Sequence, residues 1–143
     1  MGSFASWATA AVLAAGLAAG ASAAEPASVV GSWTGKADFL LPEGLARQIH
    51  RFEFQSQDGA FLRGIHSWDV PSKDIKSHDG RAFTFTANEP FLGVVDYDGT
   101  IWIAEDGDTT LFRLKPLNGE TLELLGLESG AHPVAGRGVL VRD

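Results

Sequence analysis

The residues that could bind or transform a small molecule lie mostly within short runs of alternating polar and apolar residues. In AFLRGIHSWD (residues 60–69), His66 and Trp68 fall on one face of an extended segment, and Phe61 falls on the other. The chain has 4 Trp and 9 Phe, so a pocket lined by rings is one interpretation and ordinary core packing is the other. Under the first interpretation we predict His66, Trp68 and Trp102 as ligand contacts.

Charged residues within the predicted strands form a second candidate group. Arg113 and Glu123 would make a polar spot at the base of a pocket if they faced inward, because a buried charge needs a partner. If they face outward, which is the orientation we favour, they form a cross-strand ion pair worth roughly 0.2–1 kcal/mol. Arg113, Glu123 and Tyr97 complete the predicted ligand contacts.

Nucleophilic catalysis and metal binding have no candidate of comparable strength. The sequence contains no Cys nucleophile, no Gly-x-Ser-x-Gly motif and no phosphate-binding loop. His66 and Asp69 lie on opposite faces of a strand, which suits one zinc ion poorly, and His78 follows in a loop. The acidic segments at residues 96–99 and 105–108 lack the spacing of a calcium loop and predict hairpin turns. We therefore predict no catalytic residue, metal or cofactor.

The elements that position these residues are predicted to be β-strands. The run RFEFQ places Phe52 and Phe54 on one face, which is typical of a half-buried strand. Asp-Gly pairs supply tight turns, and only residues 42–50 could hold a helical turn or two. About eight or nine short strands at regular spacing predict an all-β fold, a single antiparallel meander barrel. The predicted strands cover residues 29–39, 51–55, 60–69, 82–87, 91–97, 100–105, 109–115, 121–127 and 138–142.

The first residues differ in texture from the rest of the chain. Residues 7–20 carry no charge and precede Ala21-Ser22-Ala23, a small-x-small cleavage pattern. This pattern predicts a signal peptide over residues 1–23 and a barrel domain over residues 24–143, although the usual basic residues at the start are missing. We therefore expect a secreted or periplasmic protein and not an integral membrane protein.

Charge and cysteine content restrict the partners and the sources of stability. The formal net charge of −7 disfavours nucleic acid and anionic membranes as partners. Because the chain has no Cys, no disulfide supports the fold, and the stability must come from the core.

The first tryptophan of the predicted barrel, Trp33, lies between two glycines, Gly31 and Gly35. Burying a Trp is worth on the order of 3 kcal/mol by area, so this ring could plug one end of a small barrel. The glycines would let the backbone bend at the corner and let a neighbouring strand come close. We predict a structural role for these three residues.

This opening carries a resemblance to a known superfamily. Gly31-Ser32-Trp33 resembles the first-strand Gly-x-Trp of the calycins, which include lipocalins and avidins, and residues 94–98 are similar to the lipocalin Thr-Asp-Tyr segment, with Val95 in place of Thr. In lipocalins a basic side chain stacks on the Trp, and the resemblance implies that Arg142, or Arg137 in reserve, does so here. It also implies an open mouth that binds a small, largely apolar molecule.

The sequence thus favours an exported barrel that binds a small hydrophobic or amphipathic ligand in its mouth without catalysis. One alternative is a small-barrel enzyme of the cyclase or isomerase type with a polar site inside, which would need His66, Arg113 or Glu123 in a cavity. A second alternative is a structural barrel that self-associates through exposed rings, so a homo-oligomer is also open.

Overall fold

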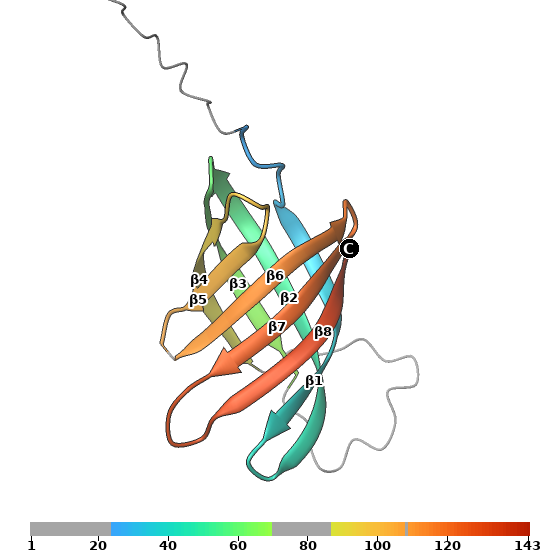
Figure 1. Cartoon of the computed structure of the whole chain (residues 1–143), viewed down its shortest axis with the longest axis vertical. Coiled ribbons are helices and arrows are strands. Elements are labelled where there is room, and N and C mark those ends of the chain that lie inside the picture. Colours follow the sequence, from blue (N-terminus) through green and yellow to red (C-terminus); the bar gives the residue numbers. More distant parts are fainter. Residues whose placement is uncertain (1–23, 70–86, 108) are drawn as a thin grey trace, which may run out of the picture.

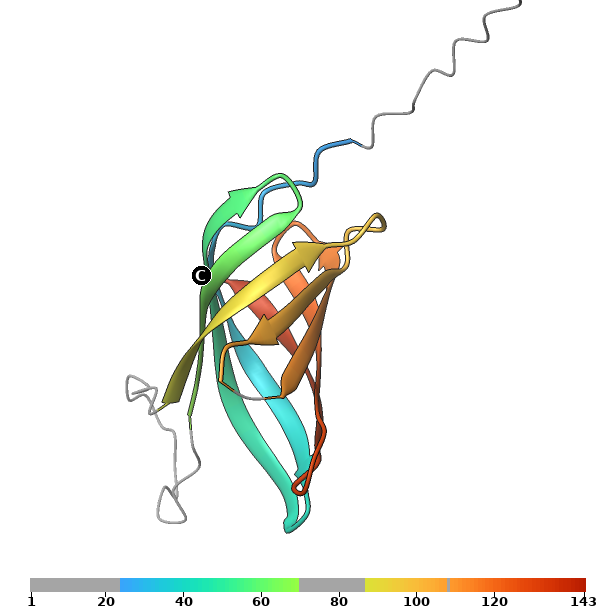
Figure 2. The same ribbon diagram turned by 90° about the vertical axis from the view of Figure 1, so that its left-hand side faces the viewer.

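The computed structural model describes residues 24–69, 87–107 and 109–143, and these form a closed antiparallel barrel (Figure 1). Each strand pairs with the next along the chain, and the last pairs back with the first (Figure 2). The predicted all-β meander barrel, with about eight or nine strands, is confirmed. The strands are β1 (Gly31–Leu41), β2 (Gly44–Asp58), β3 (Phe61–Trp68), β4 (Ala87–Val95), β5 (Ile101–Glu105), β6 (Thr110–Asn118), β7 (Thr121–Glu128) and β8 (Val134–Arg142).

Some predictions concern segments outside the described residues. The predicted signal peptide is one of them, and His78 with its loop is another. The predicted strand at residues 82–87 also lies outside, except for Ala87, which begins β4.

Two predictions about local structure are wrong. Residues 42–50 hold no helical turn, because β2 begins at Gly44 and pairs with β1 along this whole stretch, so ladder hydrogen bonds satisfy its backbone. The strand predicted to begin at Phe91 begins four residues earlier, at Ala87. It passes through Pro90, which lacks an N–H but sits opposite Ile65 in the ladder, and its carbonyl accepts a hydrogen bond from the backbone of Asp106 at 2.9 Å.

Alternation along each strand separates the barrel interior from its outer wall. Phe52 and Phe54 point inward and are buried, as their spacing in RFEFQ predicts. In β5, Ile101 and Ile103 are buried, and Trp102 between them faces outward with 37% of its surface exposed. Trp102 therefore belongs to the outer wall of the barrel and not to its interior.

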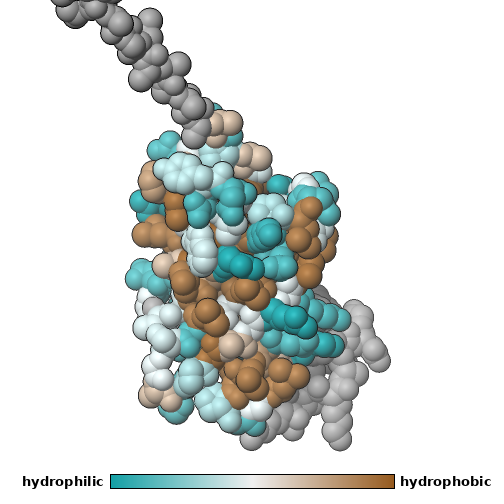
Figure 3. All heavy atoms as spheres, viewed as in Figure 1, coloured by the Kyte–Doolittle hydropathy of each residue, from teal (hydrophilic) through white to brown (hydrophobic). Residues whose placement is uncertain are grey.

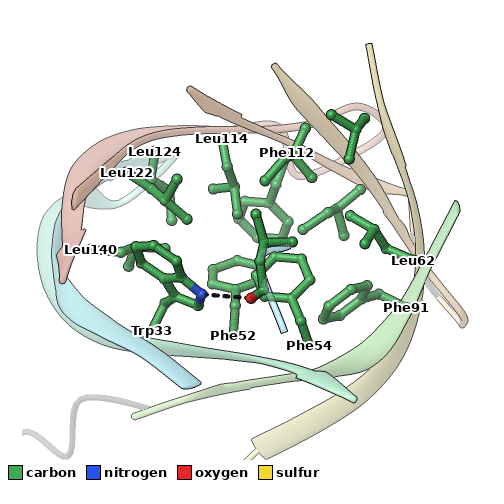
Figure 4. Close-up of a cluster of buried hydrophobic side chains, with 14 of the residues drawn as sticks. Trp33, Phe52, Phe54, Leu62, Phe91, Phe112, Leu114, Leu122, Leu124 and Leu140 are labelled. Atoms are coloured by element: carbon green, nitrogen blue, oxygen red, sulfur yellow. Dashed lines mark hydrogen bonds between the residues drawn. The ribbon is translucent and has the colours of Figure 1, made fainter. Parts of the chain in front are cut away.

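The interior next to β1 is filled by rings and leucines that face one another (Figure 4). Glycines make room for the largest rings: a Cβ at Gly64 would stand 2.1 Å from the carbonyl oxygen of Glu53 and 2.5 Å from the ring of Phe91. This part of the barrel is a packed core and leaves no room for a ligand. Its fully buried side chains include Trp33, Phe52, Phe54, Leu62, Phe91, Leu114, Leu122, Leu124 and Leu140.

Trp33 closes the end of the barrel where the chain enters. Its side chain is 1% exposed, its indole N–H donates to the carbonyl of Val29 at 2.9 Å, and the guanidinium carbon of Arg142 lies 4.3 Å from the ring centroid. Arg142 also donates to a backbone carbonyl of the segment before β1, at 3.0 Å. At Gly35 a Cβ would come within 1.9 Å of the carbonyl oxygen of Val139, so β1 and β8 can approach only because this residue is glycine.

Candidate functional site

The opposite end of the barrel contains a pocket of about 140 Å³. It is built from the strand ends farthest from Trp33, where β1, β3, β5 and β7 end and where β6 and β8 begin. Its lining mixes aromatic and polar side chains: Phe39, Leu41, Gln48, His50, His66, Trp68, Glu105, Thr110, Phe112, Leu127, Glu128 and Val134, with Gly126.

A continuous chain of hydrogen-bonding groups crosses the inner part of this pocket. Nδ1 of His50 lies 2.8 Å from Nε2 of His66, and Nε2 of His50 lies 3.2 Å from Oε1 of Gln48. At the other end, Nδ1 of His66 is paired with Oε1 of Glu105. Both histidines are 2% exposed, and the side chains of His66 and Glu105 are equally buried. Four polar side chains from β2, β3 and β5 therefore form one connected unit in the interior.

Burial determines the charge of the first histidine. Desolvation by burial and, to a smaller extent, the neighbouring charge of His66 together lower the pKa of His50 from 6.5 to about 3. At neutral pH the imidazole of His50 is therefore neutral. A neutral imidazole carries one N–H and one lone pair, so it donates on one side and accepts on the other.

Aromatic rings hold both imidazoles in place. The ring of Phe39 stacks on His50 at 4.8 Å between centroids, and the ring of Trp68 stacks on His66 at 4.9 Å. Phe52 stacks on the inner side of His66 at 4.2 Å, while Phe112 meets His66 edge-on at 4.8 Å. These contacts fix the ring planes, so the geometry of the hydrogen-bond chain is set by packing.

The local sequence explains how the pocket stays open beside such large rings. On β7 and β8, Gly126 and Gly136 are directly paired, and neither carries a side chain into the interior. A Cβ at Gly136 would lie 2.3 Å from the ring of Phe39, and a Cβ at Gly126 would lie 2.8 Å from Phe112. These two glycines give Phe39 and Phe112 the space to lie flat against the wall.

The predicted ligand contacts divide between the pocket and the outer wall. His66 and Trp68 both line the pocket. Trp102 faces outward, and Tyr97 stands in a turn with 98% of its surface exposed. The structure thus brings only two of the predicted ligand contacts together at the mouth.

Arg113 and Glu123 also lie on the outer wall, in the orientation we favoured from the sequence. Nη2 of Arg113 donates to Oε1 of Glu123 at 2.7 Å, and both side chains are partly exposed to solvent. They form a cross-strand ion pair between β6 and β7 and add no polar spot to the pocket base.

Sequence reasoning missed several residues of the site, although the alternation contained a signal for them. His50 and Gln48 share the parity of Phe52 within one strand, so they had to face inward once β2 was extended. Glu105 shares the parity of Ile103 but was assigned to an acidic turn. That the two histidines and the glutamate converge depends on the register between β2, β3 and β5, which no local pattern reveals.

The outer wall carries further apolar surface. A groove of about 1330 Å³ runs between the segment before β1 and the hairpins next to β4, and its lining includes Phe61, Val94 and Trp102. Exposed leucines and valines also gather on the face formed by β6, β7, β8 and β1 (Figure 3). Among the residues that the structure describes, the buried polar or charged residues are His50, His66 and Thr100, and none of them lines the groove.

The described residues contain neither a candidate metal cluster nor a candidate membrane-spanning helix. Within residues 24–69, 87–107 and 109–143, no cluster of three or more His, Asp or Glu side chains could hold a metal ion. No helix in those ranges is long and apolar enough to cross a membrane.

Comparison with solved structures identifies the fold. The S-type phycobiliprotein lyase CPES from Guillardia theta superposes with a TM-score of 0.52 at 12% sequence identity, over 80% of this chain and 88% of that chain. EF1p2_mFAP2b bound to DFHBI gives a TM-score of 0.49 at 14% identity, over 80% of this chain and 93% of that chain. No protein-family model matches the sequence, and no curated protein matches it. The likeness to the lyase shows the fold alone, a calycin-like antiparallel barrel, which the Gly-x-Trp opening led us to expect.

Proposed function

We propose that this protein binds a small, flat, largely apolar molecule in the pocket at the open end of its barrel. The observation that carries the proposal is the buried chain of His50, His66 and Glu105 within an aromatic pocket. Buried polar groups cost stability unless they are paired, and this hydrogen-bonded chain lies where a ligand could reach it. We therefore infer that it serves ligand binding as well as packing. The fold supports this use, because a calycin-like barrel packed at one end can accept a guest at the other.

The size and walls of the pocket restrict the ligand. A cavity of about 140 Å³ has room for little more than one six-membered ring, since an apolar cavity of roughly 150 Å³ binds benzene. Phe39, Trp68 and Phe112 present rings to this space, and a flat ligand can extend their stack. The polar lining then orients one heteroatom of the ligand. The size and lining of the pocket therefore favour an amphipathic aromatic compound as the ligand and not a long acyl chain.

A matched pair of substitutions on β8 tests this function. Val134 lines the pocket and Val139 faces outward on the same strand, so Val134→Trp should fill the pocket while Val139→Trp leaves it open. Native mass spectrometry or calorimetry with a panel of one-ring and two-ring aromatic compounds measures the effect. Binding to the natural sequence and to Val139→Trp, with loss in Val134→Trp, supports the proposal. No binding by the natural sequence to any compound in the panel would refute it.

Acid–base catalysis at the same site is a second candidate, favoured by the pairing of His66 with Glu105. A buried carboxylate next to an imidazole can hold a proton ready for transfer, as enzymes of the isomerase or cyclase type require. Binding and catalysis separate on one variant: Glu105→Gln should leave ligand affinity within a few-fold, and it should abolish turnover if the dyad transfers a proton. A ligand that dissociates unchanged at every pH supports the non-catalytic function.

We also propose that the protein works outside the cytoplasm, as a secreted or periplasmic protein. The uncharged segment at residues 7–20 and the small-x-small site after it support this. The test is the mass of the chain recovered after expression in a bacterial host. Export with cleavage after Ala23 or Ala24 gives a chain that begins at Ala24 or Glu25, whereas an intact leader on cytoplasmic protein contradicts the proposal.

Self-association is a separate proposal that rests on the exposed apolar side chains of the outer wall. Leu40, Leu111 and Leu127 are all exposed, and Leu111 and Leu127 are direct partners across the β6–β7 ladder. Light scattering coupled to size exclusion decides the question. A monomer at micromolar concentration would refute the proposal.

A further inference from the structure

A carboxylate lines the mouth of the pocket. Glu128 is the last residue of β7, at the lower end of the barrel in Figure 1, and it follows the inward parity of Leu124 and Gly126. It is half-buried, and both residues that pair with it in the ladders, Thr110 on β6 and Val134 on β8, also line the pocket. The carboxylate of Glu128 therefore belongs to the pocket wall and not to the outer surface.

The charges of the described lining leave this carboxylate unbalanced. The carboxyl group of Glu105 has His66 as a partner, and the imidazole of His50 is neutral because burial and the charge of His66 lower its pKa to about 3. In the described part of the chain, no Lys or Arg lines the pocket, and Glu128 forms no salt bridge. The positive charge of a ligand would offset the desolvation of this half-buried carboxylate.

The aromatic wall of the pocket lies one step deeper in the barrel than Glu128. A Cβ at Gly126, two residues before Glu128 on β7, would lie 2.8 Å from the ring of Phe112 and 3.1 Å from that of Phe39. Two residues of a strand span about 7 Å, so the backbone of Glu128 stands roughly that much nearer the mouth than these rings. A ligand whose ring contacts Phe39 and Phe112 therefore reaches the carboxylate with an arm of only a few atoms.

We infer that Glu128 binds an ammonium group and that the pocket selects compounds in which one aromatic ring carries a protonated amine on a short arm. This inference rests on the proposed binding function and adds the chemical class of the ligand. The ring enters the aromatic cavity, and the ammonium group stays at the mouth, where it donates charge-assisted hydrogen bonds to the carboxylate. A neutral ring compound still binds through the aromatic wall, but more weakly, and an anionic group at the same position is repelled.

Three probes that share a phenyl ring and a two-carbon arm test the inference. The arm ends in an ammonium group in 2-phenylethylamine, a hydroxyl group in 2-phenylethanol and a carboxylate in 3-phenylpropanoate. Calorimetry on the natural sequence at neutral pH should show that the amine binds about tenfold more tightly than the alcohol, because a charge-assisted hydrogen bond is roughly twice as strong as a neutral one. The affinity for 3-phenylpropanoate should be the lowest of the three.

A matched pair of variants on β7 tests the role of the carboxylate. Glu128→Gln keeps the shape of the side chain and removes its charge, so it should reduce the preference for the amine over the alcohol to about twofold and should raise the affinity for 3-phenylpropanoate. Because these two changes have opposite signs, a general loss of structure cannot produce both. Glu123→Gln removes the same charge from the outer wall of the same strand and should leave both preferences unchanged.

The outcomes separate this inference from the binding function on which it rests. Equal affinity of the natural sequence for 2-phenylethylamine and 2-phenylethanol would overturn the inference while leaving the binding function intact. A preference for the amine that persists in Glu128→Gln would also overturn it. Failure of the natural sequence to bind these three probes or any neutral aromatic compound would overturn both.

Discussion

The two ends of this barrel are built from similar side chains, but one end is plugged and the other contains a pocket. At the closed end, Trp33 donates to a backbone carbonyl, and Arg142 covers its ring. At the open end, Trp68 covers an imidazole and leaves a pocket of about 140 Å³ next to it. Each end therefore stacks an aromatic ring on a nitrogen-containing side chain, and at the open end the described residues leave a cavity inside the barrel next to the imidazole.

The difference lies in how each end satisfies its polar groups. The indole of Trp33 finds its acceptor in the segment before β1, so that end is satisfied by the chain itself. The chain of His50 and His66 ends on Gln48, a half-buried side chain at the pocket, where an outside molecule can compete. At the closed end the side-chain hydrogen bonds end on the backbone, which suits a structural role. At the open end they reach a pocket, which suits ligand binding.

Removing the plug should have the largest effect on stability. Trp33→Ala should lower the free energy of unfolding by about 3–5 kcal/mol, since the ring is fully buried and its removal leaves a cavity. Trp102→Ala removes the same residue type from the outer wall and should cost about 1 kcal/mol or less. Chemical denaturation measures both. Similar losses for the two variants would contradict the special role of the closed end.

The pH dependence of stability should come from the open end and be nearly as large. In the unfolded chain His50 takes up a proton near pH 6.5, whereas in the folded protein burial delays this to about pH 3. Between these values the unfolded state binds more protons, so stability is lost as the pH falls, by about 1.4 kcal/mol per unit from this group. Between pH 6.5 and 4.5 the loss should reach about 2–3 kcal/mol.

His50→Gln keeps polar atoms next to His66 and Gln48 but cannot titrate, so it isolates this contribution. Urea unfolding at a series of pH values should give a slope that is flatter than that of the natural sequence in the same window. His132→Gln, at a position exposed to solvent, should leave the slope unchanged. Parallel slopes for His50→Gln and the natural sequence would show that His50 titrates normally.

The cation over the plug should contribute less than the plug itself. Arg142→Ala should cost about 1 kcal/mol, because it removes a cation–π contact and a hydrogen bond to a partly exposed carbonyl. Arg137→Ala, at an exposed position on the same strand, should cost less. Ligand affinity at the open end should stay the same in both variants. A large change in affinity for Arg142→Ala would mean that the two ends are coupled.

The smallest effect is expected on the outer wall. A double-mutant cycle on Arg113 and Glu123, measured by chemical denaturation, should give a coupling of about 0.2–1 kcal/mol, since both side chains are partly exposed. Neither single substitution should change the affinity for aromatic probes. A loss of binding in Arg113→Ala would restore this pair as part of a ligand site.

Local pattern was enough to predict the closed end and the fold. The alternation of Phe52 and Phe54, the Asp-Gly turns and the glycines around Trp33 are each visible within a few residues, and they specify strands, corners and a plug. The pairing of Arg142 with Trp33 came from the resemblance to calycins and agrees with the β1–β8 register.

The open end could be predicted only in part. His66 and Trp68 were chosen because they share parity within one strand, and both line the pocket. His50 and Glu105 lie 16 and 39 residues from His66 in sequence, on two other strands, and only the register from β2 to β5 brings them together. Parity alone gave no means of separating Trp102, which faces outward, from Trp68, which faces inward, because both stand among large apolar residues.

The central claim is that the open end, and neither the closed end nor the outer groove, receives a ligand. Trp33, Trp68 and Trp102 each report on one of these regions, so the indole N–H signals of one NMR spectrum test all three at once. On titration with 2-phenylpropene we predict a saturable shift of the Trp68 signal, with the signals of Trp33 and Trp102 unmoved. A saturable shift of Trp102 or Trp33 with Trp68 unmoved would contradict the account.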